Sequence, residues 1–205
     1  MMAEEKSNRR SYTSPLRSHQ KEITRERILE TVAEIINEGR ILDFSIKEVA
    51  DRAGVSYGSV YRHFSTRETL IEALYEAVSE IVAQSSPFSP KSLEEIPAEM
   101  GKTLTLFEEN PTIVQAFAIA LMVNNVHPNS RHQRDQQIQQ IVLESNPHLT
   151  PEVSKQAAAI LSHLISTLTW ATLKQRFGLD SEETANALNW ALKTLIKDLI
   201  NQKGN

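Results

Sequence analysis

Residues 44–74 read FSIKEVADRAGVSYGSVYRHFSTRETLIEAL, and this stretch decides how the first part of the chain folds. Ser45, followed three residues later by Glu48, fits a capping box, which predicts that a short helix begins there. Gly54 can adopt the left-handed conformation that ends a helix at low cost, and Ser56 then caps a second short helix. Two short helices joined by such a tight turn predict a helix-turn-helix, a motif whose second helix enters the major groove of DNA.

The second of these helices, from Ser56 to Phe64, divides its residues between two tasks. Val60 and Phe64 are four residues apart, so both are expected to face the core. The other faces offer hydroxyl, phenol, imidazole and guanidinium groups to base edges or phosphates, with a glycine where the backbone can come close. The start of the preceding helix and the first turn of the following one offer further anion contacts. The predicted DNA-contacting residues are Ser45, Lys47, Ser56, Tyr57, Gly58, Ser59, Tyr61, Arg62, His63 and Arg67.

This stretch resembles the DNA-binding domain of the TetR family of bacterial transcriptional regulators. The hallmark of that family is similar to a Phe, a small hydroxyl residue and an apolar residue, then I/V-A-x-x-A-G-V-S-x-G-x-x-Y-x-H-F-x-x-K/R-x-x-L. The matching residues here are Phe44, Ser45, Ile46, Val49, Ala50, Ala53, Gly54, Val55, Ser56, Gly58, Tyr61, His63, Phe64, Arg67 and Leu70. Ser45 and Arg67 stand where Thr and Lys are commoner in the family. Both substitutions keep the functional group, a hydroxyl at position 45 and a cation at position 67. The resemblance covers about residues 24–75.

The whole chain is predicted to be helical, because its apolar residues recur every three or four positions and no strand pattern is present. The expected fold class is all-α with about nine helices. Their predicted ranges are 24–38, 45–52, 56–64, 67–84, 92–109, 111–124, 129–145, 151–177 and 181–202. With the resemblance, the expected organisation is a disordered basic arm (1–20), a helix-turn-helix domain (21–66) and a helical ligand-binding and dimerisation domain (67–205).

The net charge of −4 hides an asymmetry along the chain. The segment from Lys6 to Arg27 holds seven cations and two anions, whereas the chain from Glu68 onward holds 10 cations and 16 anions. A basic segment before an acidic remainder suggests that the first part meets a polyanion. For the arm itself two interpretations stay open, namely contact with DNA and a solubilising tail that contacts nothing.

Composition argues against several other classes of protein. The 205 residues include no Cys, which excludes disulfide scaffolds, thiolate metal sites and thiol nucleophiles. The six His form no HxxxH pair, so neither a metal nor another cofactor is expected. Without a P-loop, a GxSxG motif or a defensible carboxylate pair, an enzyme is not expected. No apolar run approaches the ~18 residues of a membrane span, so a cytoplasmic, nucleoid-associated protein is expected.

The second half of the chain is longer than DNA reading requires. Helix 111–124 is apolar on most sides, which is typical of a helix that is buried or lines a cavity. Apolar walls with sparse polar groups describe a small-molecule pocket, and they also describe an ordinary helical core. The resemblance implies a pocket for a hydrophobic or amphipathic inducer. The candidate lining residues are Met100, Leu104, Phe107, Phe117, Leu121, Met122, Asn125, His163, Thr167 and Trp170.

The last two predicted helices have features of an association surface. Small residues between positions 157 and 166 permit close helix approach, and four leucines have the spacing of a helix-packing seam. These leucines are Leu188, Leu192, Leu195 and Leu199. Ile196, Ile200 and Trp190 widen the apolar surface beyond what one core needs. The resemblance implies a homodimer through a four-helix bundle of these two helices from each subunit, and burial within one subunit is the alternative.

Together, the residues and the resemblance predict a ligand-responsive DNA-binding regulator. It would be a homodimeric repressor that releases its DNA operator when a small effector binds. The operator is expected to be palindromic, because a two-fold symmetric dimer binds two half-sites related by the same symmetry. The alternative is a DNA-bound interaction protein that recruits a protein partner through its acidic part and has no small-molecule inducer. An enzyme is the third hypothesis, and it would require clustered titratable groups in the pocket.

Overall fold

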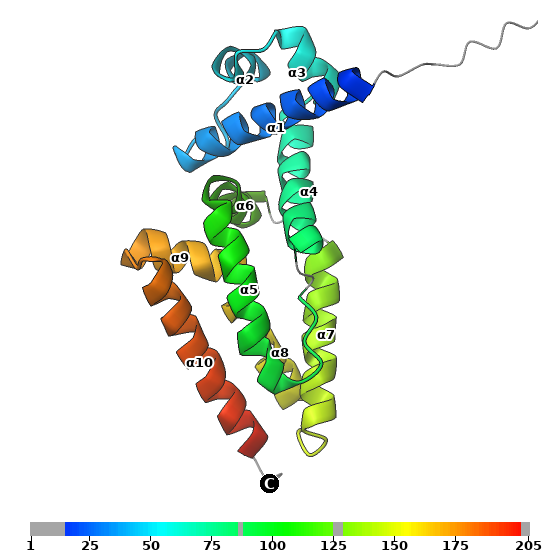
Figure 1. The fold of residues 1–205 in the computed structure, drawn as a ribbon. Helices are drawn as coiled ribbons and strands as arrows, with labels where there is room; N and C mark the ends of the chain where they lie inside the picture. The colour runs from blue at the N-terminus through cyan, green and yellow to red at the C-terminus, as the bar shows by residue number, and fades with distance from the viewer. Residues whose placement is uncertain (1–14, 86–87, 125–128, 202–205) are drawn as a thin grey trace, which may run out of the picture.

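The computed structural model describes residues 15–85, 88–124 and 129–201, and these residues form helices and connecting loops with no strand (Figure 1). The all-α fold class is therefore confirmed. The first four helices are α1 (Pro15–Asn37), α2 (Ile46–Ala53), α3 (Tyr57–His63) and α4 (Arg67–Ser85). After a 3-10 turn at Leu93–Glu95, the others are α5 (Ile96–Glu109), α6 (Pro111–Asn124), α7 (Asn129–Ser145), α8 (Pro151–Leu164), α9 (Thr167–Phe177) and α10 (Ser181–Asn201).

Helix α1 begins at Pro15 and not near Thr24, so residues 15–20 are helical although the sequence predicted a disordered arm there. Proline suits the first turn of a helix, because its missing N–H is one that the helix leaves unpaired, and Arg, Lys, Gln and Glu are good helix formers. Inside the helix, the Thr24 hydroxyl donates to the Gln20 carbonyl at 2.8 Å. The rest of the predicted arm, residues 1–14, lies outside the described residues.

The single helix predicted over 151–177 is two helices. Helix α8 ends at Leu164 and α9 begins at Thr167, with Ser166 as the N-cap, because the Ser166 hydroxyl oxygen accepts a hydrogen bond from the Thr169 amide at 3.2 Å. The buried side chain of Ile165 fills the corner. Among the described residues the structure therefore has ten α-helices where the sequence predicted about nine.

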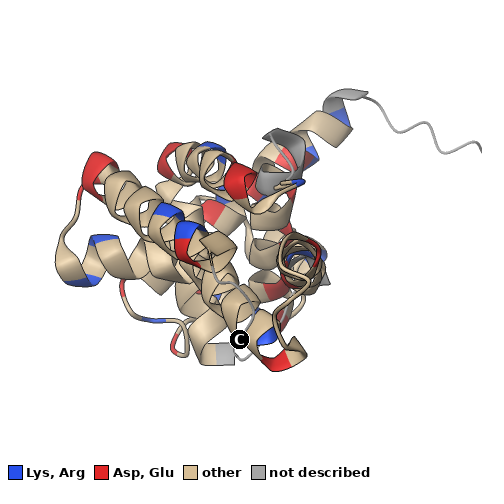
Figure 2. Ribbon diagram, turned by 90° about the horizontal axis from the view of Figure 1, so that it is seen from below, with Lys and Arg blue, Asp and Glu red and all other residues tan. Residues whose placement is uncertain are grey.

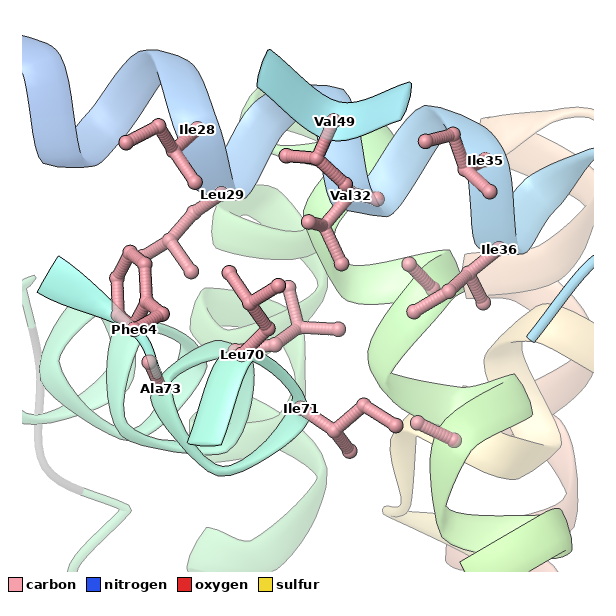
Figure 3. Packing of buried hydrophobic residues seen from close by; sticks show 14 of the residues in the cluster. Ile28, Leu29, Val32, Ile35, Ile36, Val49, Phe64, Leu70, Ile71 and Ala73 are labelled. Carbon is pink, nitrogen blue, oxygen red and sulfur yellow. The ribbon is translucent and has the colours of Figure 1, made fainter. Parts of the chain in front are cut away.

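We call α1–α3 the head and α4–α10 the body. Helices α2 and α3 lie on the far side of α1 from the body (Figure 1). The head core joins α1, α2, α3 and α4, and Ile28, Val32, Val49 and Leu70 converge within it (Figure 3). The same cluster includes Phe117 of α6, so the head core continues into the body.

A second cluster fills the body and includes Trp170, with buried side chains from α5, α6, α7, α8, α9 and α10. The Trp170 indole N–H donates to the Glu108 carboxylate at 2.8 Å, and the Lys174 ammonium donates to the same carboxylate at 2.6 Å. Burial acts to raise the pKa of Glu108, but the hydrogen bonds from Lys174, Ser181 and Trp170 outweigh it and hold the pKa below its usual range. This ionised carboxylate therefore joins α5, α9 and α10.

The leucine seam of α10 faces inward. Leu188, Leu192 and Leu199 are buried in the body core together with Ile196. For these residues the alternative of burial within one subunit is correct, because α10 packs on α5, α8 and α9 of its own chain. The exposed apolar side chains of α10 are instead Trp190, Leu195 and Ile200.

In the described part of the chain no single helix is long and apolar enough to cross a membrane. One pair, Leu93–Glu109 with Pro111–Val123, reaches that length and composition jointly and is bent by 106° between its members.

Candidate nucleic-acid interface

The helix-turn-helix forms by the local interactions that its sequence predicts. The Ser45 hydroxyl accepts from the Glu48 amide at 3.1 Å, and the Ser56 hydroxyl accepts from the Ser59 amide at 3.1 Å, so each serine caps its helix. Gly54 has φ +63° and is the left-handed residue that ends α2. A side chain at this position would strain the turn that sets α3 against α2.

Two arginine pairs fix α2 to the end of α1. Arg40 donates both guanidinium edges to Glu48, and Arg52 donates to both Glu38 oxygens at 2.7 and 2.9 Å. The hydrogen bond from Arg40 is the main cause of a lowered pKa at Glu48, and that from Arg52 lowers the pKa of Glu38. Such bidentate pairs restrict orientation as well as distance, so they set the angle at which α2 presents α3.

Helix α3 leaves its predicted DNA-contacting face exposed. Tyr57 and Tyr61 are each 54% exposed, and their rings stack with centroids 6.1 Å apart. The Arg62 guanidinium donates to the Ser59 hydroxyl oxygen at 3.0 Å. This contact holds a cation against α3, while Val60 is fully buried and anchors the opposite side of the helix.

Gly58 is exposed, and a methyl group built on its Cα would meet nothing within 4 Å. The fold therefore does not require glycine at this position, although glycine in a helix costs roughly 0.5–1 kcal/mol relative to alanine. Because Gly58 has no side chain, a partner such as DNA could approach the backbone of α3 closely at this position. No contact of the described residues explains why position 58 is a glycine, so Gly58 stays a predicted DNA contact.

The predicted contacts that flank α3 have different surroundings. Lys47 is exposed on α2, whereas the Ser45 hydroxyl already serves as the cap. The Arg67 guanidinium donates to the Leu42 carbonyl at 2.6 Å and lies 3.7 Å from Glu68. Arg67 therefore ties the start of α4 to the loop between α1 and α2, an intramolecular role that the sequence did not indicate.

His63, at the end of α3, is half-buried and faces the first turns of α1. Burial lowers the pKa of His63, and the cations Lys21, Arg25 and Arg62 lower it further against the opposing effect of Glu22.

Helix α1 places cations beside α3 that were not among the individually predicted contact residues. A groove of about 540 Å³ lies between α1 and α3, with Arg17, Gln20, Lys21 and Thr24 on one wall. Ser59, Arg62 and His63 form the other wall. Lys and Arg residues lie along the first turns of α1 (Figure 2). The basic run of the sequence was the available signal, but the position of α1 beside α3 was not visible in it.

A second cleft, of about 610 Å³, lies between α1, α4 and the turn before α6. Its wall includes Glu22, Glu26 and Glu30 of α1, together with Glu80 and Glu109. The three α1 glutamates are exposed. Their helical positions place them on the side of α1 away from the groove that contains Lys21.

The structure does not bring the candidate effector residues into one pocket. Five of them lie in the body core, namely Met100, Leu104, Phe107, Thr167 and Trp170. Phe117 and Leu121 pack in the head core, Met122 is 59% exposed and His163 is exposed. Asn125 lies outside the described residues. Helix α6 is apolar on all sides because it packs between two hydrophobic cores. From the sequence alone, such a helix cannot be distinguished from one that lines a cavity. Within the described residues, no three His, Asp or Glu are grouped so as to hold a metal ion.

These observations define a class of protein: a helix-turn-helix DNA-binding head on a larger helical body. Residues 28–74 match the family model described as "Bacterial regulatory proteins, tetR family". Residues 28–74 are therefore similar to the DNA-binding domain of that family of regulators.

Solved structures of such regulators share the fold of most of this chain. NalD, the secondary repressor of the MexAB-OprM multidrug efflux pump in Pseudomonas aeruginosa, is 19% identical with a TM-score of 0.60 over 85% of this chain and 96% of NalD. A TetR-family regulator from Syntrophomonas wolfei is 17% identical with a TM-score of 0.61 over 90% and 100% of the two chains. A Rhodococcus regulator is 21% identical with a TM-score of 0.61 over 87% and 99%. No curated protein matches the chain significantly.

Replacing Gly58 with alanine should stabilise the protein by roughly 0.5–1 kcal/mol and weaken its binding to DNA. The added methyl group meets no protein atom, so its only steric conflict is with a partner. Denaturant unfolding and fluorescence anisotropy with labelled duplex DNA measure the two effects. Gly101→Ala is the matched control, because Gly101 is an exposed helical glycine of α5 with the same open surroundings. Unchanged DNA affinity of the Gly58→Ala variant would contradict this explanation.

The free energy of unfolding should fall as pH decreases from about 7.5 to about 5.5, and His63→Gln should reduce that fall. Because the pKa of His63 is lowered in the folded state, the unfolded chain binds more protons in this window and gains stability from acid. Carboxylates with lowered pKa values change the free energy of unfolding only at lower pH, where they become protonated. Urea titrations at several pH values test this, with His148→Gln, an exposed loop histidine, as the control. Equal pH slopes for wild type and the His63→Gln variant would refute it.

Proposed function

We propose that the protein is a homodimeric, ligand-responsive repressor that binds a palindromic DNA operator with Ser56–His63 in the major groove. The observation that carries this proposal is the exposed face of α3, where two stacked tyrosines flank a glycine that the fold does not need. The division into a DNA-reading part before residue 67 and a regulatory part after it belongs to the same proposal.

The proposed dimer rests on apolar side chains that one subunit leaves in solvent. Trp190 is 71% exposed and Ile160 is 54% exposed, on helices α10 and α8, which contact each other within the subunit. Leu195 and Ile200 of α10 and Val153 of α8 are also exposed. Large apolar residues concentrated on two adjacent helices are typical of an association surface. A two-fold pairing of these helices would set the distance between the two α3 helices.

The proposed effector site lies in the body core, among Met100, Phe107 and Trp170. Three buried polar atoms of the body, Ser154 Oγ, Thr184 Oγ1 and Asn146 Nδ2, have no hydrogen-bond partner among the described residues. Unpaired buried polar groups are costly, and an amphipathic ligand that reaches them would lower that cost. Because α6 contributes to both cores, an effector that shifts α6 would favour a different spacing of the heads.

DNA selected from a random pool by this protein should contain inverted repeats, and Trp190→Glu should lower both dimerisation and affinity for that DNA. A carboxylate placed in an apolar dimer interface would be desolvated without a partner. Sedimentation and anisotropy titrations measure the two effects together. Met122→Glu makes the same kind of change at a 59% exposed site on α6 and should alter neither. Selection that recovers no enriched sequence, or affinity that depends only on salt, would contradict operator reading.

A compound that copurifies with the protein and is identified by mass spectrometry should lower operator affinity when added back. The expected change is about 5- to 150-fold, the usual range of coupling between two sites. The operator should weaken binding of that compound by the same factor, which calorimetry in the presence and absence of DNA measures. Operator binding that no copurifying compound changes would instead favour the alternative of a DNA-bound protein that recruits a partner.

A further inference from the structure

We infer that the cleft between α1, α4 and the start of α6 binds an organic dication, a diamine whose two ammonium groups are joined by an apolar chain. This acidic cleft is the cavity of about 610 Å³ described above. It is separate from the effector site proposed in the body core. Its ligand is bound without DNA, so the inference goes beyond the proposed function and does not depend on it.

The wall of the acidic cleft carries an excess of negative charge. It includes one cation, Arg25, and the carboxylates of Glu22, Glu26, Glu30, Glu80 and Glu109. Arg25 lies 3.7 Å from Glu22 and 3.7 Å from Glu76, so its charge is already shared between two carboxylates. Among the described residues, no cation forms an ion pair with the other four carboxylates of the wall. A cleft lined by one sign of charge concentrates ions of the opposite sign.

Apolar side chains from all three elements complete the wall. Leu29 of α1 is buried, and Ile81 of α4 and Ile113 of α6 are half-buried. A ligand with a hydrocarbon part gains free energy by covering such side chains, whereas an inorganic cation does not. Among the described residues, no three acidic side chains are grouped so as to hold a metal ion. The volume of the cleft is in the usual range for a small-molecule site. These features favour an organic cation over a metal ion.

The arrangement of the carboxylates indicates two separated charges on the ligand. Carboxylates only accept hydrogen bonds, and none of the described wall residues is aromatic, so the ligand has to donate N–H groups to them. Glu22, Glu26 and Glu30 follow one another at four-residue steps, and the first and last are about 12 Å apart along the helix axis. A diamine with a chain of about eight carbons spans a similar distance and presents its apolar part to the wall.

A ligand in this cleft would contact the head and the body at the same time. Helix α1 belongs to the head, whereas α4 and α6 belong to the body, and the three pack on one another. The carbonyl of Thr112, a wall residue, accepts a hydrogen bond of 3.0 Å from the Asn37 side chain of α1. A bound diamine would add ionic contacts to this junction. It would therefore favour the orientation of the head that gives the cleft its present shape.

The test is a calorimetric titration of the full-length protein with 1,8-diaminooctane, without DNA and at about 0.01 M ionic strength, where charges are weakly screened. Saturable binding of one diamine per subunit is expected. Glu26→Gln combined with Glu30→Gln should raise Kd by about 2- to 30-fold, because two exposed ion pairs are lost. The diol of the same length, 1,8-octanediol, has no charge and should show no saturable binding at the same concentrations.

The control double variant is Glu72→Gln with Glu152→Gln, which removes the same charge at exposed sites outside the cleft. Its Kd should equal that of the wild type, and an equal rise in both double variants would overturn the inference in favour of a net-charge effect. An unchanged Kd in the cleft variant would show that the diamine binds elsewhere and would also overturn it. The same holds for a wild type that does not bind the diamine saturably or binds the diol as tightly.

A third double variant tests the basic segment of the chain itself as the occupant of the cleft. Arg9→Gln with Arg10→Gln removes two cations of that segment, which lies outside the described residues. If the segment occupied the cleft, the diamine would bind more tightly to this variant, and the assignment to a diffusible ligand would be overturned. An unchanged Kd supports it.

Discussion

Burial of α6 between two hydrophobic clusters is the constraint on which the rest of the structure depends. Phe117 and Ala120 face the head core, whereas Val114 and Ala118 face the body core. Two hydrogen bonds to α6 add to this packing, one from the Tyr75 hydroxyl of α4 to the Ala120 carbonyl and one from the Asn37 side-chain amide of α1 to the Thr112 carbonyl, each at 3.0 Å. Close-packed interiors transmit displacement instead of absorbing it. Helix α6 therefore offers a path by which a displacement in the body core can reach α1 and α4.

The features predicted correctly from the sequence are those decided within a few residues. The caps at Ser45 and Ser56 and the left-handed Gly54 depend on side chains and backbone of their own turn, and each formed as predicted. The break at Ser166 was missed because an apolar pattern continues through it, and only the cap hydrogen bond ends one helix there. The inward leucines of α10 were ambiguous for another reason. Helical spacing indicates that a face is apolar, but not whether its partner belongs to the same chain.

The same distinction applies to the functional residues. Tyr57, Gly58 and Tyr61 could be predicted as DNA contacts from the sequence because a DNA-reading helix needs exposed groups at such positions, and the structure shows all three to be exposed. Arg67 was assigned to phosphate from its place in a first helical turn, but its bond to the Leu42 carbonyl spans 25 residues and no local pattern shows it. The groove between α1 and α3 could not be predicted, because its prediction requires the relative position of two helices. Lys21 and His63 are far apart in the chain and become neighbours only through packing of α1 on α3.

Helix α1 combines opposite charges on opposite faces, and this explains how an acidic protein can present a DNA-binding head. Its Arg17 and Lys21 line the groove beside α3, whereas Glu22, Glu26 and Glu30 line the cleft on the other side. At physiological salt a charge acts over about 8 Å, which is less than the diameter of a helix with its side chains. A polyanion at the groove would therefore be attracted by the cations and largely screened from the glutamates. An approach from the cleft side would meet the carboxylates first, so the charge pattern of α1 selects one orientation of the head and the net charge of −4 does not oppose it.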